Sequence, residues 1–438
     1  MAQSETIKLV IVGHIDHGKS TLIGRILYDT HSLVPDKIAE IERASREAGL
    51  DTLELAFALD HLREEREQGI TIDTSQIFFR TDKREYVIID APGHVEFMKN
   101  MITGASQADA AVVIVDASRG IQEQTRRHLV TVSLLGIERI IVAVNKMDLI
   151  GYEEPSFSRL SGEITDFLAT LEIAPAAVIP VSAARGDNVV SPSARMPWYN
   201  GPDMVRCLDS LVPPVSTANE PLAFCAQDIY RDRDRRIVVG RVENGTVRAG
   251  STIKILPSAI TTRVKSIEKF LEEKEIAEAG ECIGLTTEDD VFLERGLVIC
   301  EEGKEPFLGD TFTANIFWIG RQTHKKGEKI TLRLTTQETT AVIETIHKRI
   351  DSETWALLNT DADELGFLEI GEVTLRCKKQ VIFNLFKRSK EMGRFVLMKD
   401  GTICAGGIVT KVARRPAPSP VKSFYDRNNG HTPGVAVR

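Results

Sequence analysis

The segment that most restricts the fold of this chain lies at residues 7–28. An apolar stretch, IKLVIVG, leads directly into GHIDHGKS (13–20), and an amphipathic segment follows at 19–28. This order matches the G-x-x-x-x-G-K-[ST] phosphate-binding loop, which needs a strand before it and a helix after it. The glycines let backbone N–H groups surround phosphate oxygens, and the helix N-terminus adds positive potential. The motif predicts a nucleotide-binding α/β unit at the start of the chain.

Five apolar runs before residue 210 predict the sheet of this unit. They are IKLVIVG, YVIIDAPG, AAVVIVDA, IIVAVNKMD and AAVIPVSA. Near-continuous Val, Ile and Ala are typical of strands buried on both faces, as in parallel sheets with helices on either side. Segments 19–28 and 160–172 are the helices we expect between them. The proline-rich stretch 208–221 predicts a linker.

Beyond the linker, alternating strands predict two small all-β barrels. Asn244-Gly245 stands between two such strands and predicts a two-residue hairpin, because both positions favour positive φ. The expected organisation is a nucleotide-binding domain at 1–212, β-barrels at 213–305 and 306–412, and a tail at 413–438. The tail is rich in Pro, Asn and Gly, so we expect it to be disordered.

Charge and cysteine usage restrict the partners. The net charge of -8 weighs against a protein that grips nucleic acid through its phosphates. Six scattered cysteines without a C-x-x-C pair indicate buried reduced thiols rather than a zinc site or disulfides. The N-terminus has no signal-peptide pattern, and no apolar run reaches about 18 residues. We therefore expect a cytoplasmic protein with no membrane partner.

The phosphate end of the expected site has five candidates. Lys19 should reach the β- and γ-phosphates, and the Ser20 hydroxyl should ligate Mg²⁺. Asp90 closes the strand EYVIID, where a carboxylate would meet Mg²⁺ through a water, and Gly93 lets the backbone approach the γ-phosphate. Thr71 is the expected second protein ligand of Mg²⁺, available only while the γ-phosphate holds its loop.

The base end follows the fourth and fifth apolar runs. Asp148 of Asn145-Lys146-Met147-Asp148 can accept hydrogen bonds from N1–H and the 2-amino group of guanine, which adenine does not offer. Lys146 would lay its stem along the base, and the turn Ser182-Ala183-Ala184 would supply a backbone N–H for O6. A site built on specific hydrogen bonds rejects the wrong base by factors of about 10⁴. The bound nucleotide is therefore expected to be GTP or GDP.

His94 follows Asp-Ala-Pro-Gly directly and is the candidate for positioning the attacking water, with a structural role as the alternative. With Lys19 and Thr71 it completes the expected catalytic set. We identify no arginine finger in the sequence, and such a residue supplies about 10³–10⁵ in rate, so slow intrinsic hydrolysis is expected. The residues expected to contact the nucleotide are Gly13, His14, Asp16, His17, Gly18, Lys19, Ser20, Thr21, Asp90, Gly93, Asn145, Lys146, Asp148, Ser182, Ala183 and Ala184.

These motifs together resemble the translation-factor class of GTPases, which includes elongation factors Tu and 1-alpha. GHIDHGKSTLIGRIL, EQGITID, DAPGHVEFMKNMITGASQADAAVVIVDA and NKMDL carry the resemblance. Within the class, segments 71–74, 186–202, 311–320 and 393–409 are similar to the GTPase subunit of bacterial heterodimeric sulfate adenylyltransferase. That resemblance implies GTP hydrolysis that drives adenosine 5'-phosphosulfate formation on a small catalytic subunit, the expected partner.

An alternative stays open, because GHIDHGKS and DAPGHVEFMKN are closer to the elongation factors than to the familiar form of that subunit. The alternative is an elongation-factor-like GTPase that binds tRNA or the ribosome. Such a factor needs a basic face. The one concentrated basic stretch, RDRDRR (231–236), is diluted by two aspartates, and we interpret it as a solvated loop.

Overall fold

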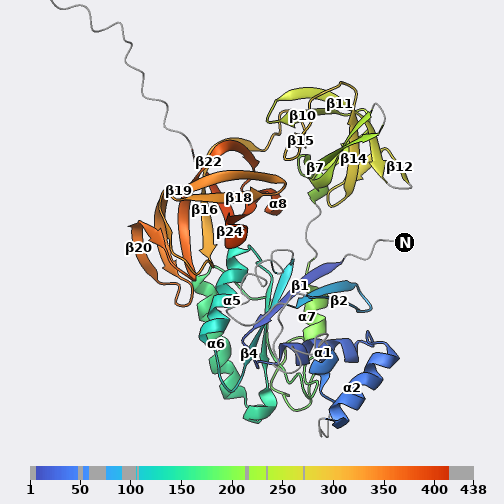
Figure 1. Ribbon diagram of the computed structural model, residues 1–438. Helices are drawn as coiled ribbons and strands as arrows, with labels where there is room; N and C mark the ends of the chain where they lie inside the picture. The colour runs from blue at the N-terminus through green and yellow to red at the C-terminus, as the bar shows by residue number, and fades with distance from the viewer. Residues whose placement is uncertain are drawn as a thin grey trace, which may run out of the picture.

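The computed structural model describes residues 6–47, 53–58, 75–90, 105, 108–212, 217–232, 235–269 and 272–413. The chain forms an α/β domain followed by two β domains (Figure 1). The predicted fold class is therefore confirmed. The predicted tail lies outside the described residues beyond position 413.

The α/β domain is built on a six-stranded sheet in the order β2-β3-β1-β4-β5-β6. Its strands are β1 (Ile7–Gly13), β2 (Ser75–Arg80), β3 (Glu85–Asp90), β4 (Ala110–Asp116), β5 (Ile140–Asn145) and β6 (Ala177–Pro180). All neighbours are parallel except β2, which pairs antiparallel with β3 at the edge. The carboxyl ends of β1, β3, β4 and β5 therefore meet along one edge of the sheet, where ligands bind in open α/β folds.

Helices cover both faces of this sheet. They are α1 (Lys19–Asp29), α2 (Pro35–Glu47), α5 (Glu123–Leu134), α6 (Glu154–Thr170) and α7 (Met204–Ser210), with 3-10 turns η1 (Leu55–Ala58) and η3 (Met147–Ile150). Alternate residues of β1 point to opposite cores. Leu9 and Ile11 pack with α1 and α7, whereas Val10 and Val12 pack with α5 and α6.

Helix α6 begins earlier than the sequence pattern indicated. We predicted a helix at 160–172, and the structure places it at Glu154–Thr170. Pro155 lies in its first turn. Proline is tolerated there because the first N–H groups of a helix have no partner within the helix. The helix therefore extends six residues further toward the N-terminus than predicted.

The first β domain, called the first barrel here, is a closed ring. Its order is β10-β15-β7-β8-β14-β11, and a β10–β11 pairing closes it. The six strands are β7 (Ala223–Asp232), β8 (Arg235–Asn244), β10 (Thr252–Leu256), β11 (Ile260–Lys269), β14 (Cys282–Thr287) and β15 (Val298–Cys300). The turn η4 (Thr217–Asn219) precedes the ring, and β12 (Glu272–Lys274) extends its edge beside β11.

Two local predictions for the first barrel were wrong. Asn244-Gly245 is not a hairpin turn, because β9 (Thr246–Arg248) pairs with β13 (Ile276–Glu278) rather than with β8. Only Gly245 has positive φ, at 75°. The stretch 231–236 is not a loop throughout, as we had interpreted it, since Arg231 pairs with Arg236 at the ends of β7 and β8.

The second β domain, the second barrel, closes in the order β18-β23-β24-β16-β22-β19 through a β18–β19 pairing. Its strands are β16 (Phe307–Trp318), β18 (Lys329–Leu334), β19 (Gln337–Asp351), β22 (Glu369–Phe383), β23 (Arg394–Lys399) and β24 (Thr402–Val412). Strand β20 (Leu357–Ala362) extends the edge beside β19, β17 (His324–Lys325) pairs with β21 (Glu364–Leu365), and α8 (Lys390–Gly393) precedes β23.

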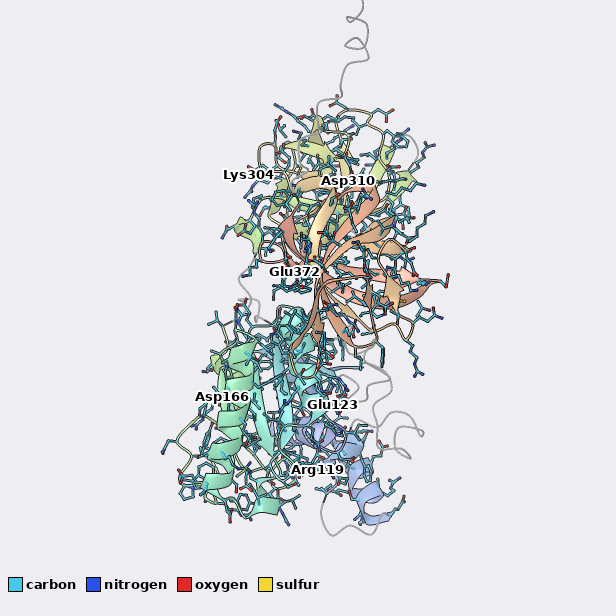
Figure 2. All side chains as sticks on the ribbon, turned by 90° about the vertical axis from the view of Figure 1, so that its left-hand side faces the viewer. Arg119, Glu123, Asp166, Lys304, Asp310 and Glu372 are labelled. Atoms are coloured by element: carbon cyan, nitrogen blue, oxygen red, sulfur yellow. The ribbon has the colours of Figure 1, made fainter. Side chains whose placement is uncertain are left out.

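The two barrels pack against each other through a buried apolar cluster. Ile382 and Met392 of the second barrel join Cys225, Val298 and Cys300 of the first. The chain passes from the first barrel to the second just before β16. Lys304 precedes this strand and Asp310 lies near its start, as labelled in Figure 2. Burial raises the pKa of the Cys300 thiol to about 12, so this cysteine is an inert part of the packing.

The predicted state of the cysteines needs one correction. All six are free, and four are buried as expected, but Cys282 is exposed and Cys404 is partly exposed. None of the helices that the structure describes has the length and apolar character needed to cross a membrane.

The second barrel also packs on the α/β domain, along α5 (Figure 1). Phe317 and Ile370 of the barrel belong to the same buried cluster as Leu129 of α5. On the polar side, Arg127 of α5 pairs with Glu353 at 3.3 Å. Apolar packing and an ion pair therefore hold the barrel against this helix.

Gly136, just after α5, accommodates a ring from the second barrel. Its φ is 65°, and a Cβ there would overlap the Phe386 side chain, which is 8% exposed. We expect Gly136→Ala to lower the free energy of unfolding by about 3 kcal/mol, from backbone strain plus overpacking. Chemical denaturation measures this loss.

Gly151 offers a matched control, since its φ is also 65° and nothing lies within 4 Å of a Cβ built there. Gly151→Ala should cost only the backbone term, about 1 kcal/mol. Equal losses in the two variants would show that Phe386 does not press on Gly136.

Candidate nucleotide-binding site

The loop between β1 and α1 adopts a conformation that restricts its residues. Asp16 and Gly18 have φ of 64° and 90°. A Cβ at Gly18 would lie 2.5 Å from the Asn145 amide nitrogen, so only glycine fits this position without displacing Asn145. Helix α1 then begins at Lys19 without a side-chain cap. Its first N–H groups are therefore available to an anion held by the loop.

Lys19 is folded back over this loop. Its Nζ donates to the carbonyl oxygens of Gly13 and His14, at 3.1 and 3.4 Å, and the residue is 8% exposed. Burial lowers the pKa of the Lys19 ammonium, and attraction to Asp90 and Asp16 opposes that shift. A buried cation among backbone dipoles gains from a phosphate arriving beside it.

The edge of the sheet gathers three buried polar side chains at successive strand ends. Asp90, Asp116 and Asn145 end β3, β4 and β5, and each is 1–2% exposed. Asp116 was missed by sequence reasoning, although it ends one of the apolar runs. Its carboxylate pairs with Lys146 Nζ at 2.9 Å. Burial works against ionisation of Asp116, but bonds from Ser118 and Lys146 outweigh it and lower the pKa.

Asn145 joins the phosphate loop to the turn after β6. Its Nδ2 donates to the His17 carbonyl at 2.8 Å, and its Oδ1 accepts from the Ala183 N–H at 2.9 Å. Asp148 lies close by, where its Oδ1 accepts from the Ser182 hydroxyl at 2.6 Å. Among the described residues, hydrogen bonds of Asn145 thus connect the predicted phosphate loop to the turn predicted to contact the base.

We predicted that the Ser182-Ala183-Ala184 turn supplies an N–H donor to the base. The Ala183 N–H already donates to Asn145 Oδ1, so it is not the donor that the prediction needs. Of these residues, Ala184 is then the one on whose N–H the prediction of a donor to guanine O6 rests. The turn is closed by bonds from the N–H groups of Arg185 and Gly186 to the Ser182 carbonyl, at 3.2 and 2.7 Å. A closed turn of this kind presents its donors in a fixed direction before a ligand binds.

Two histidines behind the loop are buried and neutral. His17 is 0% exposed, with its Nδ1 3.2 Å from the Ile114 carbonyl oxygen and its Nε2 3.2 Å from the Oε1 atom of Gln122. Burial lowers the pKa of His17 to about 4 and that of His128, in α5, to about 3. A neutral ring can donate to only one carbonyl, so Gln122 must turn its NH₂ group toward the other nitrogen. His14 lies nearer the surface, with its Nδ1 at 2.7 Å from the Ile15 carbonyl.

These pKa values predict that the protein loses stability in acid. Below pH 6.5 the unfolded chain protonates both histidines, whereas the folded protein keeps them neutral down to about pH 4. As the pH is lowered below 6.5, the free energy of unfolding should therefore decrease by up to about 1.4 kcal/mol per pH unit for each histidine.

His128→Gln isolates one of these contributions. Its slope of unfolding free energy between pH 6.5 and 4 should be shallower than the wild-type slope by about that amount. Denaturant titrations at four or more pH values give both slopes. The same slope in variant and wild type would contradict the neutral buried state of His128.

The ion-binding residues fit Mg²⁺ only in part within the described chain. Ser20 and Thr21 are partly buried in the first turn of α1, and the buried Asp90 carboxylate ends the strand beside β1. Hydroxyl and carboxylate oxygens are the ligands that Mg²⁺ prefers. Thr71, Gly93 and His94 lie outside the described residues. In the part of the chain that the structure describes, no group of three His, Cys, Asp or Glu side chains could hold a metal.

Comparison with known protein families matches each of the three domains. Residues 4–218 match the elongation factor Tu GTP binding domain, residues 235–300 match elongation factor Tu domain 2, and residues 311–410 match the GTP-eEF1A C-terminal domain-like family. The α/β domain is therefore a guanine-nucleotide-binding domain.

Individual relatives cover nearly all of the chain. Sulfate adenylyltransferase subunit 1 of Laribacter hongkongensis is 36% identical over 93% of this chain and 86% of its own length. The same subunit of Methylorubrum populi is 36% identical over 95% and 89%. The bifunctional enzyme CysN/CysC of Mycobacterium tuberculosis is 36% identical over 95% of this chain and 69% of its own length. The chain belongs to the elongation-factor-Tu-like family of translation-factor GTPases, and within it is similar to subunit 1 of sulfate adenylyltransferase.

Proposed function

We propose that the site binds Mg²⁺ and GTP and hydrolyses the γ-phosphate bond. Lys19 and the first N–H groups of α1 would receive the β- and γ-phosphates, and Ser20 and Thr71 would hold the ion, with Asp90 acting through a water. Asp148 accepts from guanine N1–H and the 2-amino group, while Lys146 lies along the base. The bound ion would neutralise charge that develops on the phosphate oxygens.

Hydrolysis places a water on the γ-phosphorus and yields GDP and phosphate. We assign the alignment of this water to His94, and we expect Gly93 to let the backbone approach the γ-phosphate. Loss of that phosphate would release Thr71 and its loop. Because no arginine finger is identified in the sequence, we expect slow hydrolysis by the isolated chain and acceleration by a partner.

We further propose that the chain is the GTPase subunit of a sulfate adenylyltransferase and works in the cytoplasm. The observation that carries this proposal is the 36% identity to subunit 1 over 93% of the chain, which includes both barrels. On the small partner subunit, a sulfate oxygen would attack the α-phosphorus of ATP and release pyrophosphate. GTP hydrolysis here would drive that unfavourable step toward adenosine 5'-phosphosulfate.

The charges of the first barrel argue against the tRNA-binding alternative. Arg235 pairs with Glu268 at 3.5 Å, and Arg236 pairs with Asp290 at 3.5 Å. A face that binds phosphates needs uncompensated cations, because affinity comes from counterion release. Here acidic side chains stand beside the basic ones.

Co-expression with a small sulfate adenylyltransferase subunit tests the proposal. We expect a stable complex and a sulfate-dependent ATP–pyrophosphate exchange that GTP stimulates. A GTP-dependent complex with aminoacyl-tRNA, and none with the small subunit, would contradict it and favour the alternative. We also propose that the three domains span residues 1–212, 213–305 and 306–412.

A further inference from the structure

Arg25 connects α1 to the turn that we assign to the base. Its Nε donates to the Ala183 carbonyl at 3.0 Å, and its Nη2 donates to the Ala184 carbonyl at 2.8 Å. The same guanidinium pairs with Asp29 at 3.4 Å, one turn further along the helix, and the Arg25 side chain is 16% exposed. The planar fork of arginine thus holds two consecutive peptide groups in one orientation.

The hydrogen bonds from Arg25 also determine the direction in which the Ala184 N–H points. The peptide that carries the Ala183 carbonyl also carries the Ala184 N–H. In a planar trans peptide the C=O and N–H bonds point in opposite directions. Because Arg25 holds the carbonyl toward α1, the Ala184 N–H must point away from α1.

A second clamp holds the turn from the sheet. Asn145 Oδ1 accepts from the Ala183 N–H at 2.9 Å, so the turn is fixed by β5 on one side and by α1 on the other. A charged donor on the carbonyl also polarises the peptide and strengthens its N–H as a donor. Both effects prepare the Ala184 N–H for an acceptor before any ligand arrives.

We propose that Arg25 is a positioning residue for base selection, which orients the Ala184 N–H toward guanine O6. This inference rests on the guanine site proposed above and adds a residue outside its motifs. Helix α1 begins at Lys19, so the helix that receives the phosphates also sets the base contact about two turns later.

The test compares binding of GDP with binding of 6-thio-GDP, in which a weakly accepting sulfur replaces O6. Wild-type protein should bind GDP about tenfold more tightly, as expected for one hydrogen bond. In Arg25→Ala the GDP affinity should fall by about tenfold and the preference over 6-thio-GDP should approach one. Arg25→Lys, which can donate to one carbonyl, should recover part of the preference.

Two further comparisons separate this role from a general structural one. The preference for GDP over IDP reports the 2-amino contact of Asp148 and should not change in Arg25→Ala. Arg159→Ala is a matched control, because Arg159 also pairs with an acid one turn along its helix, Glu163 at 3.1 Å, but is 72% exposed. It should leave every affinity unchanged.

The outcomes distinguish this inference from the proposed site. A wild-type preference for GDP over 6-thio-GDP that persists in Arg25→Ala and Arg25→Lys overturns the role of Arg25 alone. Equal wild-type affinities for GDP and 6-thio-GDP overturn the O6 contact. If wild-type protein does not prefer GDP to ADP, the guanine site itself is wrong.

Discussion

Replacing Asp148 with asparagine should move the nucleotide preference from guanine to xanthine. The carboxylate accepts two hydrogen bonds from guanine in our assignment, and the amide would turn one acceptor into a donor. Xanthine carries a carbonyl oxygen where guanine carries its 2-amino group, so the new donor has a partner there. The Ser182 hydroxyl, 2.6 Å from Asp148 Oδ1, can donate or accept and so keeps its contact.

We expect the affinity for GTP to fall by about 10²–10⁴ and the affinity for XTP to rise above it. Competition against a fluorescent nucleotide measures both. Asp166→Asn makes the same chemical change on the exposed face of α6, as Figure 2 shows, and should alter neither affinity. Unchanged GTP binding in Asp148→Asn would contradict the assigned base contact.

Asn145→Ala should abolish tight nucleotide binding and also destabilise the α/β domain. Asn145 is 2% exposed and satisfies the His17 carbonyl and the Ala183 N–H. Removing the side chain leaves both backbone groups buried without this hydrogen bond, which should lower the free energy of unfolding by about 1–3 kcal/mol for each group. It also frees the phosphate loop and the base turn from each other. We expect affinity for GDP to fall by at least about 10².

Asn188→Ala serves as the control for stability. Asn188 is also 2% exposed and also bridges two backbone groups, the Pro180 carbonyl at 2.9 Å and the Ser193 N–H at 2.7 Å. It should cost a similar free energy of unfolding with a much smaller loss of affinity. If both variants lose affinity in proportion to stability, Asn145 has no specific role at the site.

The strands and the phosphate loop could be predicted because their signals are local. Buried Val and Ile runs define β1, β4 and β5, and the spacing of Gly18 and Lys19 defines the loop. Parallel pairing then brings the strand ends together without further information. Asp148 and Ser182 could be assigned to one site for the same reason, because they follow the ends of neighbouring parallel strands.

The contacts that hold the site could not be predicted, because they depend on tertiary packing. Arg25 and Asn145 each reach the Ala183 region from a distant part of the chain, and the ion pair between Asp116 and Lys146 joins the ends of two strands. Asn244-Gly245 failed as a hairpin for a related reason. The strand partners of the first barrel, rather than the two turn residues, decide which segments pair there.

The most direct test asks whether the base that residue 148 recognises controls the activity of the partner subunit. Asp148→Asn is assembled with the small subunit, and adenosine 5'-phosphosulfate formation is measured with GTP or XTP. We predict that GTP stimulates the wild-type complex and XTP stimulates the variant complex, because hydrolysis in this chain drives the partner. Stimulation of the variant by GTP as strong as that of the wild type, or no response to XTP although the variant hydrolyses it, would contradict the account.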